Sequence, residues 1–137
     1  MEGHPHILVA DDDASIRRLL EAVLKREGCE VESVINGSQA IEKLRTGSYS
    51  MVLLDLMMPV MNGFEVLNLL DRDERLRGVH VVIVSAASAK DIETAGGVFV
   101  CQVLQKPFDL KDLLRSVHRC VDKASRNEHE KEVELPL

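Results

Sequence analysis

The sequence predicts an α/β protein with a doubly wound, five-stranded parallel sheet that is covered by helices on both faces. Short apolar runs typical of buried parallel strands alternate with segments whose apolar residues recur at helical spacing. This unit of a strand and a helix repeats five times along the chain. Strict alternation of this kind favours a single parallel sheet with right-handed crossover connections.

The first half of the chain supplies three of these units. Its strands are expected at residues 6–10, 31–35 and 51–55, where apolar residues run together. A helical pattern follows each strand and is bounded by residues that start or stop helices. The three helices are expected from Asp13 to Gly28, from Gly37 to Gly47 and from Phe64 to Leu70.

The second half supplies the remaining two strands, at 79–84 and 98–104. The stretch 88–97 between them is a poor helix, because Ile92 is its only large apolar residue and two glycines close it. Asp109 is expected to cap a final helix. That helix carries a continuous apolar stripe made of Leu110, Leu113, Leu114, Val117 and Val121.

Composition limits the classes of function. A chain of 137 residues with 45% hydrophobic content fits one domain. Its net charge of -6 argues against a large nucleic-acid or anionic-membrane surface. No apolar stretch approaches the roughly 18 residues of a membrane span, and no signal-peptide core precedes residue 6. We therefore expect a cytoplasmic protein that binds neither DNA nor a membrane directly.

Three cysteines, Cys29, Cys101 and Cys120, are odd in number and widely spaced, without a CxxC pair. This pattern indicates neither a disulfide framework nor a zinc site. Buried free thiols in a reducing cytosol are expected instead.

Charged residues end three of the apolar runs: Asp11 and Asp12 the first, Asp55 the third and Lys106 the fifth. Ligands of open α/β sheets collect outside the strand ends, so these groups should meet in one crevice. Carboxylates held that close repel one another unless a cation lies among them. An all-oxygen ligand set without His or Cys suits Mg²⁺ better than zinc.

The same crevice suits phosphoryl transfer. A carboxylate fixed at a strand end, as expected for Asp55, can act as a nucleophile once the charge of the phosphoryl group is neutralised. Lys106 would supply a positive charge to a phosphoryl oxygen, and Ser85, which follows the fourth apolar run, a hydroxyl donor. The bond between Lys106 and Pro107 is a candidate for a cis peptide.

Four stretches together resemble the receiver domain of two-component response regulators. They are HILVADDD at 6–13, LLDLMMPVMNG at 53–63, VVIVSA at 81–86 and QKPF at 105–108. The resemblance covers about residues 5–123. It implies a flavodoxin-like (βα)5 domain over 1–123. Residues 124–137 are charged, mixed in sign and without an apolar stripe, so we expect a helix extension or a disordered tail there.

The resemblance also implies roles for single residues. Asp55 is similar to the phosphoacceptor, Lys106 to the lysine that pairs with the phosphoryl group, and Ser85 to the switch hydroxyl. Asp12 and Asp55 would bind Mg²⁺ directly, with the backbone carbonyl of Met57 as a third ligand and Asp11 acting through water. The donor would be a phosphohistidine on a sensor histidine kinase or phosphotransfer protein. The chain would catalyse only its own phosphorylation and slow dephosphorylation, and would signal by contact with an output protein that the sequence does not identify.

Two departures from the family pattern concern the surface that switches. Val103 stands where an aromatic ring is usual, and Val98-Phe99-Val100 replaces the usual Gly-Ala. Valine cannot swing between buried and exposed rotamers as a ring does. A receiver-like interaction module that works without phosphorylation is therefore the alternative. A phosphohydrolase is disfavoured, because it needs a second acid two residues after Asp55, where Met57 stands.

Overall fold

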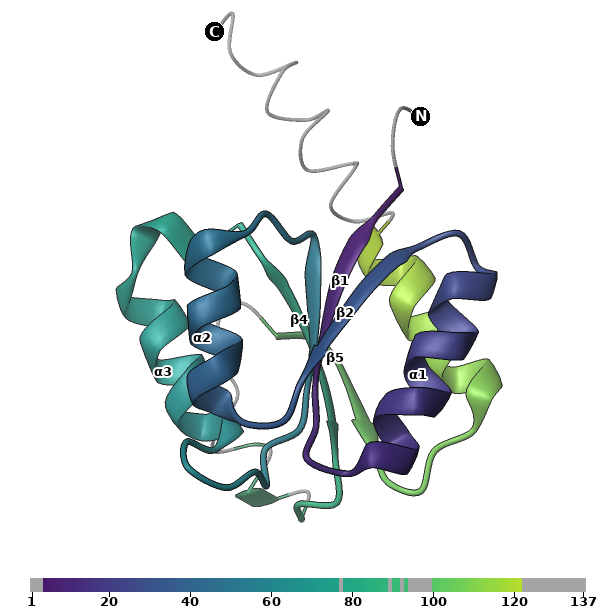
Figure 1. Cartoon of the computed structure of the whole chain (residues 1–137). Coiled ribbons are helices and arrows are strands. Elements are labelled where there is room, and N and C mark those ends of the chain that lie inside the picture. The colour runs from purple at the N-terminus through teal and green to yellow at the C-terminus, as the bar shows by residue number, and fades with distance from the viewer. Residues whose placement is uncertain (1–3, 77, 89, 92, 94–99, 122–137) are drawn as a thin grey trace, which may run out of the picture.

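The computed structural model describes residues 4–76, 78–88, 90–91, 93 and 100–121. One parallel sheet with the strand order β2-β1-β3-β4-β5 forms its centre (Figure 1). The strands are β1 (His6–Ala10), β2 (Glu30–Val34), β3 (Met51–Leu54), β4 (His80–Ser85) and β5 (Val100–Gln105). The helices are α1 (Ala14–Arg26), α2 (Gly37–Thr46), α3 (Gly63–Arg72), the short 3₁₀ turn η1 (Glu74–Leu76) and a C-terminal helix at 110–121.

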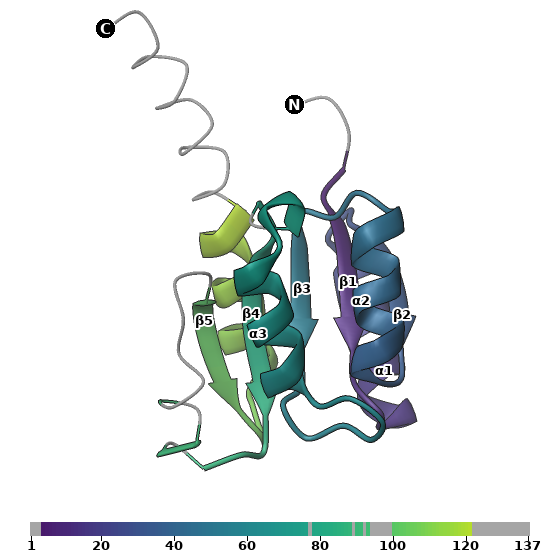
Figure 2. The same ribbon diagram turned by 90° about the vertical axis from the view of Figure 1, so that its left-hand side faces the viewer.

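The sheet separates two apolar layers. Alternate strand residues face opposite sides, so Leu8 packs toward α2 and α3, whereas Ile7 and Val9 pack toward α1 and the C-terminal helix. Figures 1 and 2 show these two pairs of helices on the two faces of the sheet. The predicted doubly wound, flavodoxin-like fold is therefore confirmed.

Most expected elements are confirmed with shifts of one or two residues at their ends. Gly28 adopts a φ of 88° directly after the cap of α1, a left-handed conformation that ends helices and suits glycine. Asp13 caps the start of α1, and the Asp109 carboxylate accepts the Lys111 N–H at the start of the C-terminal helix. Leu110 is exposed, so the expected apolar stripe begins at Leu113.

Some expectations fall wholly or partly outside the described residues. In the weak helix expected at 88–97, residues 90, 91 and 93 are helical, and most of the others are not described. Residues 98–99 of the expected fifth strand and the expected tail at 124–137 also lie outside. Among the described residues, no helix has both the length and the apolar character that crossing a membrane requires.

The prediction of three free thiols was wrong for two of them. Cys101 of β5 and Cys120 of the C-terminal helix form a disulfide, and Cys29 alone is free. The spacing in the sequence could not reveal this pair, because a fold rather than a local motif brings the two residues together.

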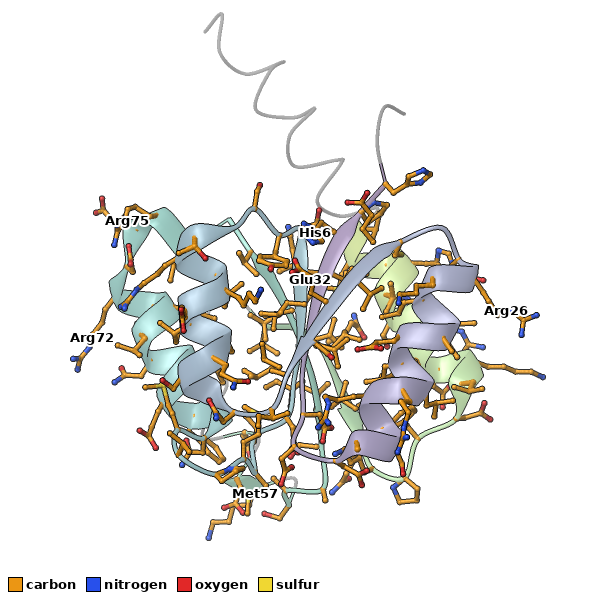
Figure 3. All side chains as sticks on the ribbon, viewed as in Figure 1. His6, Arg26, Glu32, Met57, Arg72 and Arg75 are labelled. Carbon is orange, nitrogen blue, oxygen red and sulfur yellow. A yellow bond between two sulfur atoms is a disulfide. The ribbon has the colours of Figure 1, made fainter. Side chains whose placement is uncertain are left out.

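A polar network closes the end of the sheet where the strands begin. The Glu32 carboxylate accepts a hydrogen bond of 2.6 Å from the Tyr49 hydroxyl and lies 2.8 Å from His6 and 3.4 Å from Lys43. The rings of His6 and Tyr49 contact each other, with centroids 4.4 Å apart. Figure 3 shows His6 and Glu32 at this end, and Met57 at the opposite end.

This network shifts two pKa values in opposite directions. The hydrogen bond from Tyr49, with those from Lys43 and His6, lowers the pKa of Glu32 below its ordinary 4.5. Burial, and the hydrogen bond to this carboxylate, raise the pKa of Tyr49 above its ordinary 10.0. The hydrogen bond between a neutral phenol and an ionised carboxylate therefore stabilises the fold between the two ordinary pKa values, 4.5 and 10.0. Its contribution to stability falls at lower and at higher pH.

We expect Tyr49→Phe to lower the free energy of unfolding by about 1 kcal/mol at pH 7, because the ring stays while the hydrogen bond is lost. The difference from wild type should shrink as the pH falls below 4.5, where protonation of Glu32 removes the charged acceptor. Urea unfolding at several pH values measures both effects. A difference that is equally large at pH 3 and pH 7 would contradict this account.

Candidate functional site

The candidate site lies at the carboxyl ends of β1, β3, β4 and β5. Asp55 directly follows β3, and its backbone N–H donates to the carbonyl of Ala10 at the end of β1. The Asp11 N–H in turn donates to the carbonyl of Val34 at the end of β2. The parallel register therefore continues beyond the strands and places both buried aspartates side by side.

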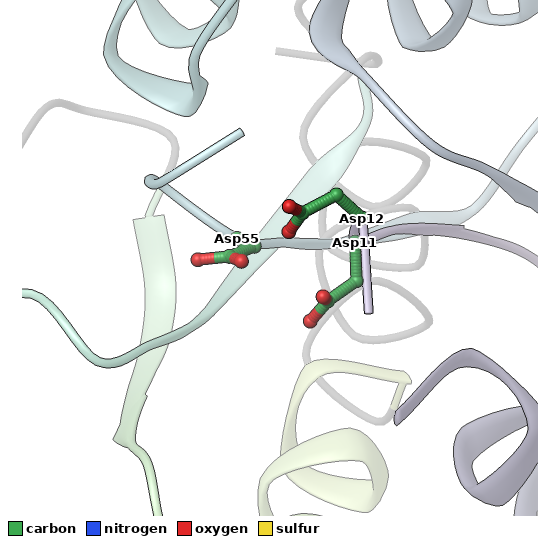
Figure 4. A group of neighbouring side chains, drawn as sticks. All are labelled: Asp11, Asp12 and Asp55. Atoms are coloured by element: carbon green, nitrogen blue, oxygen red, sulfur yellow. The ribbon is translucent and has the colours of Figure 1, made fainter. Parts of the chain in front are cut away.

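Three carboxylates converge at this point, as Figure 4 shows. Asp11, Asp12 and Asp55 each offer an oxygen, and these atoms lie within 4.8 Å of one another. Asp11 and Asp55 are buried, whereas Asp12 is exposed. This set of hard oxygen ligands fits a divalent cation such as Mg²⁺, which would relieve the repulsion among them.

The Lys106 ammonium bridges the two buried carboxylates. Its Nζ lies 2.7 Å from Asp11 Oδ2 and 3.4 Å from Asp55 Oδ2. Lys106 directly follows β5, and its N–H donates to the carbonyl of Ser85 at the end of β4. The peptide bond that joins it to Pro107 is cis, the isomer for which the sequence made it a candidate.

Burial and charge act on these groups in opposite directions. Burial raises the pKa of Asp11 above its ordinary 3.8, although the hydrogen bond from Lys106 acts to lower it. Burial alone would lower the pKa of Lys106, but its bonds to Asp11 and Asp55 outweigh this and raise it. The lysine is thus held in its charged form between two acids.

The Ser85 hydroxyl is the second side-chain group in contact with Asp55. It is fully buried and donates a hydrogen bond of 2.9 Å to Asp55 Oδ1. The same Oδ1 accepts the N–H of Met57 at 3.0 Å. The predicted residues Asp11, Asp12, Asp55, Ser85 and Lys106 are therefore brought together. Met57, for which the backbone carbonyl was predicted as a ligand, is joined to Asp55 through its backbone N–H, and its side chain is 60% exposed.

The structure adds residues that sequence reasoning missed. Arg17 of α1 donates to the backbone carbonyl of Asp11 at 2.9 Å, and the Gln105 amide donates to the carbonyl of Ala87 at 3.0 Å. Both bonds fix turns that carry site residues. They join positions distant in the chain or in different elements, so no local motif signalled them.

Two glycines hold the loop that follows Asp55. The Gly37 N–H donates to the Met61 carbonyl, and the Gly63 N–H donates to the Leu56 carbonyl. A Cβ at Gly37 would collide with the Met61 carbonyl, and one at Gly63 with the backbone of Asp55. Close approach of backbones therefore requires glycine at both positions.

Together, the fold and this crevice define a flavodoxin-like α/β domain with an acidic site at the carboxyl ends of its strands. The family model of the response regulator receiver domain matches residues 7–118. The chain therefore belongs to the receiver domains of response regulators, which are signalling modules of two-component systems rather than classical enzymes.

Individual relatives agree with this assignment. The transcriptional regulatory protein YkoG of Bacillus subtilis is 32% identical over 82% of the chain, which spans 49% of its length. The structure of a sensor protein from Polaromonas is 33% identical, with a TM-score of 0.80 over 89% of this chain and 99% of that one. TrrA of Thermotoga maritima, solved in complex with Mg²⁺-BeF, is 28% identical, with a TM-score of 0.75 over 85% of this chain and 98% of that one.

One residue of the site loop is held in an unfavourable backbone conformation. Val60 has a φ of 66°, and its side chain is 82% exposed, so packing does not compensate. A branched side chain at positive φ costs about 1–2 kcal/mol. Asparagine tolerates this conformation better.

We therefore expect Val60→Asn to raise the free energy of unfolding by about 1 kcal/mol, measured by thermal and urea unfolding. Ile35→Asn is the matched control, because Ile35 is also exposed but has no positive φ. That control should give no gain. A Val60→Asn variant that melts at or below the wild-type temperature would show that the loop conformation carries no such cost.

Proposed function

We propose that this receiver domain accepts a phosphoryl group from a phosphohistidine onto Asp55 and thereby changes its contacts with another protein. The observation that carries the proposal is the position of Asp55: buried at a strand end, beside two further acids, and bonded to Ser85 and Lys106. The donor is a sensor histidine kinase or a phosphotransfer protein, the class of partner with which receiver domains interact. The domain covers residues 1–123 and acts in the cytoplasm.

The two oxygens of Asp55 have different surroundings. Oδ1 accepts hydrogen bonds from Ser85 and from the Met57 N–H, whereas Oδ2 has the longer contact with Lys106. The hydrogen bonds hold the carboxylate in one orientation and leave lone pairs on Oδ2 for attack. A bond forms between this oxygen and phosphorus, the bond from phosphorus to the donor histidine breaks, and the imidazole leaves.

Charge compensation comes from Lys106 and from a bound cation. Asp12, Asp55 and the Met57 backbone carbonyl would hold Mg²⁺ directly, and Asp11 through water, because all these ligands are hard oxygens. The Mg²⁺-BeF complex of TrrA supports this ligand chemistry. When bound, Mg²⁺ neutralises negative charge on the phosphoryl oxygens. Lys106, whose Nζ lies 3.4 Å from Asp55 Oδ2, would supply a second positive charge to the same phosphoryl oxygens.

Ser85 connects the modified carboxylate to the rest of the fold. In the structure, its hydroxyl donates to Asp55 and accepts the N–H groups of Leu56 and Ala87. If the hydroxyl moved to donate a hydrogen bond to a phosphoryl oxygen instead, these bonds would break and the turn that follows β4 would move. The changed surface would then bind the output protein.

Val103 favours a second candidate function, a receiver-like interaction module that binds its partner without phosphorylation. This side chain is 44% exposed on β5, where the family usually has a ring that reports the movement of the switch hydroxyl. The complete set of acids with Ser85 and Lys106 opposes the alternative, because a module without phosphorylation has no need for buried like charges.

The proposal predicts that the chain gains one phosphoryl group when incubated with Mg²⁺ and a small-molecule phosphodonor. Intact mass spectrometry measures the gain. Asp55→Asn and a metal-chelated sample should show none, because they lack the nucleophile and the cation. Asp13→Asn is the matched control, since asparagine caps a helix as well as aspartate and the gain should remain.

No gain in wild type, with the fold intact by circular dichroism, would reject phosphorylation on Asp55 and favour the interaction module. A gain of equal size in Asp55→Asn would place the modification elsewhere.

We also predict that the phosphorylated form loses its phosphoryl group slowly. Met57 and Ala87, two positions after Asp55 and Ser85, offer no side-chain group that could orient an attacking water. Met57→Asn should shorten the half-life by about tenfold by positioning such a water, whereas Met57→Leu should leave it unchanged. A wild-type half-life no longer than that of Met57→Asn would contradict the prediction.

A further inference from the structure

The disulfide between Cys101 and Cys120 lies outside the phosphorylation site and has no part in the proposed function. It joins β5 to the C-terminal helix across 19 positions of sequence, with Cα atoms 6.1 Å apart. Both residues belong to the apolar layer between the sheet and α1 with the C-terminal helix. It thus ties an edge strand to the helix that covers it.

A β-bulge aims Cys101 at this layer. In the pairing of β4 with β5, Val81 faces Val100 and Val82 faces Gln102, so Cys101 is the extra residue. Val100 packs on one face of the sheet, and Cys101 and Leu104 pack on the other. Residues 101 and 104 are an odd number of positions apart and would face opposite sides of a regular strand. The bulge removes this conflict and turns Cys101 toward Cys120.

The two sulfurs differ in their access to solvent. Cys120 is fully buried, whereas Cys101 is partly exposed. A reagent in solution can therefore reach the bond only from the Cys101 side. Buried neighbours such as Leu113 and Val117 also attach the C-terminal helix to the sheet, so the helix does not depend on the bond alone. A reduced Cys120 would remain in this layer as a small apolar side chain.

We propose that Cys101 and Cys120 form a reversible redox site, closed and opened by thiol–disulfide exchange with a low-molecular-weight thiol and disulfide such as those of glutathione. In a reducing compartment an intracellular disulfide is typically transient or redox-sensing rather than permanent. Oxidation would then link β5 covalently to the C-terminal helix. Lys106 directly follows β5, so the link lies in the strand that leads to the site.

Closure proceeds in two exchanges. The Cys101 thiolate attacks one sulfur of glutathione disulfide, forming a mixed disulfide and releasing one glutathione thiolate. The Cys120 thiolate then attacks the Cys101 sulfur and releases the second glutathione. Two electrons pass from the protein to glutathione disulfide, and the two thiol protons end on the released glutathione molecules. Opening reverses these steps, with external glutathione attacking the accessible Cys101 sulfur.

The test titrates the intact chain through glutathione buffers of increasing oxidised fraction. Each sample is quenched in acid, unfolded, labelled with a maleimide and analysed by intact mass spectrometry. Wild type should change from three labels to one in a single step. Cys29→Ala is the matched control and should change from two labels to none at the same buffer ratio, because Cys29 is the free cysteine. Cys101→Ala and Cys120→Ala should keep two labels throughout, apart from mixed glutathione adducts that the mass identifies.

Two outcomes would overturn the proposal. Three labels at every ratio, with the fold intact, would show that the pair does not close. One label even in the most reducing buffer would show a permanent structural bond. Because Cys101 is partly exposed, Cys101→Ala keeps the test usable if the buried Cys120→Ala variant fails to fold.

Amide hydrogen exchange tests whether the bond acts as a local tie. Oxidation should slow exchange about tenfold or more at 100–106 and 110–121 and leave β1 and β3 unchanged, and should raise the melting temperature by about 10 °C. Equal exchange rates in the two redox forms would contradict the claim that the disulfide restrains β5 and the C-terminal helix. None of these measurements involves phosphorylation, so failure here is separate from failure of the proposed function.

Discussion

The ammonium of Lys106, held between Asp11 and Asp55, is the interaction on which the site depends. Two buried carboxylates within one crevice repel each other, and the lysine is the cation that the chain itself supplies to offset this. Buried ion pairs of this kind contribute little net stability, because desolvation cancels much of the attraction. Their retention therefore points to a role in function. In the proposed function, the arrangement would keep the Asp55 carboxylate next to a positive charge that an incoming phosphoryl group could share.

The strand order explains how distant residues reach this point. β1 and β3 are neighbours at the centre of the sheet, so the residues that follow them, Asp11 and Asp55, lie side by side. Lys106 follows the edge strand β5 and reaches the acids past Ser85 at the end of β4. Ligands of doubly wound sheets bind at the carboxyl ends of the strands where the strand order reverses. In this sheet the reversal lies between β1 and β3.

Sequence reasoning succeeded where the signal was local. Apolar runs located the strands within one or two residues, and charges at their ends identified Asp11, Asp12, Asp55 and Lys106 as neighbours, because parallel strands end at the same edge. It failed where the three-dimensional context decided. The disulfide depends on a bulge that turns one residue of β5, and a bulge leaves no mark in hydrophobic periodicity. The left-handed φ of Val60 was equally hidden, since propensity alone argues against a branched residue there.

The acids at the two ends of the sheet have pKa values that are shifted in opposite directions, and this contrast points to the functional end independently of any motif. At the end where the strands begin, Glu32 is surrounded by donors from Tyr49, Lys43 and His6, and its pKa is lowered. The ionised Glu32 carboxylate has hydrogen-bond donors there, and the network stabilises the fold. At the opposite end, burial raises the pKa of Asp11 despite its lysine partner, and the neighbouring Asp55 carboxylate adds a smaller effect in the same direction. Proteins tolerate such local conflict mainly at sites that bind or react, so the acidic end is the one that a cation and a phosphoryl group would complete.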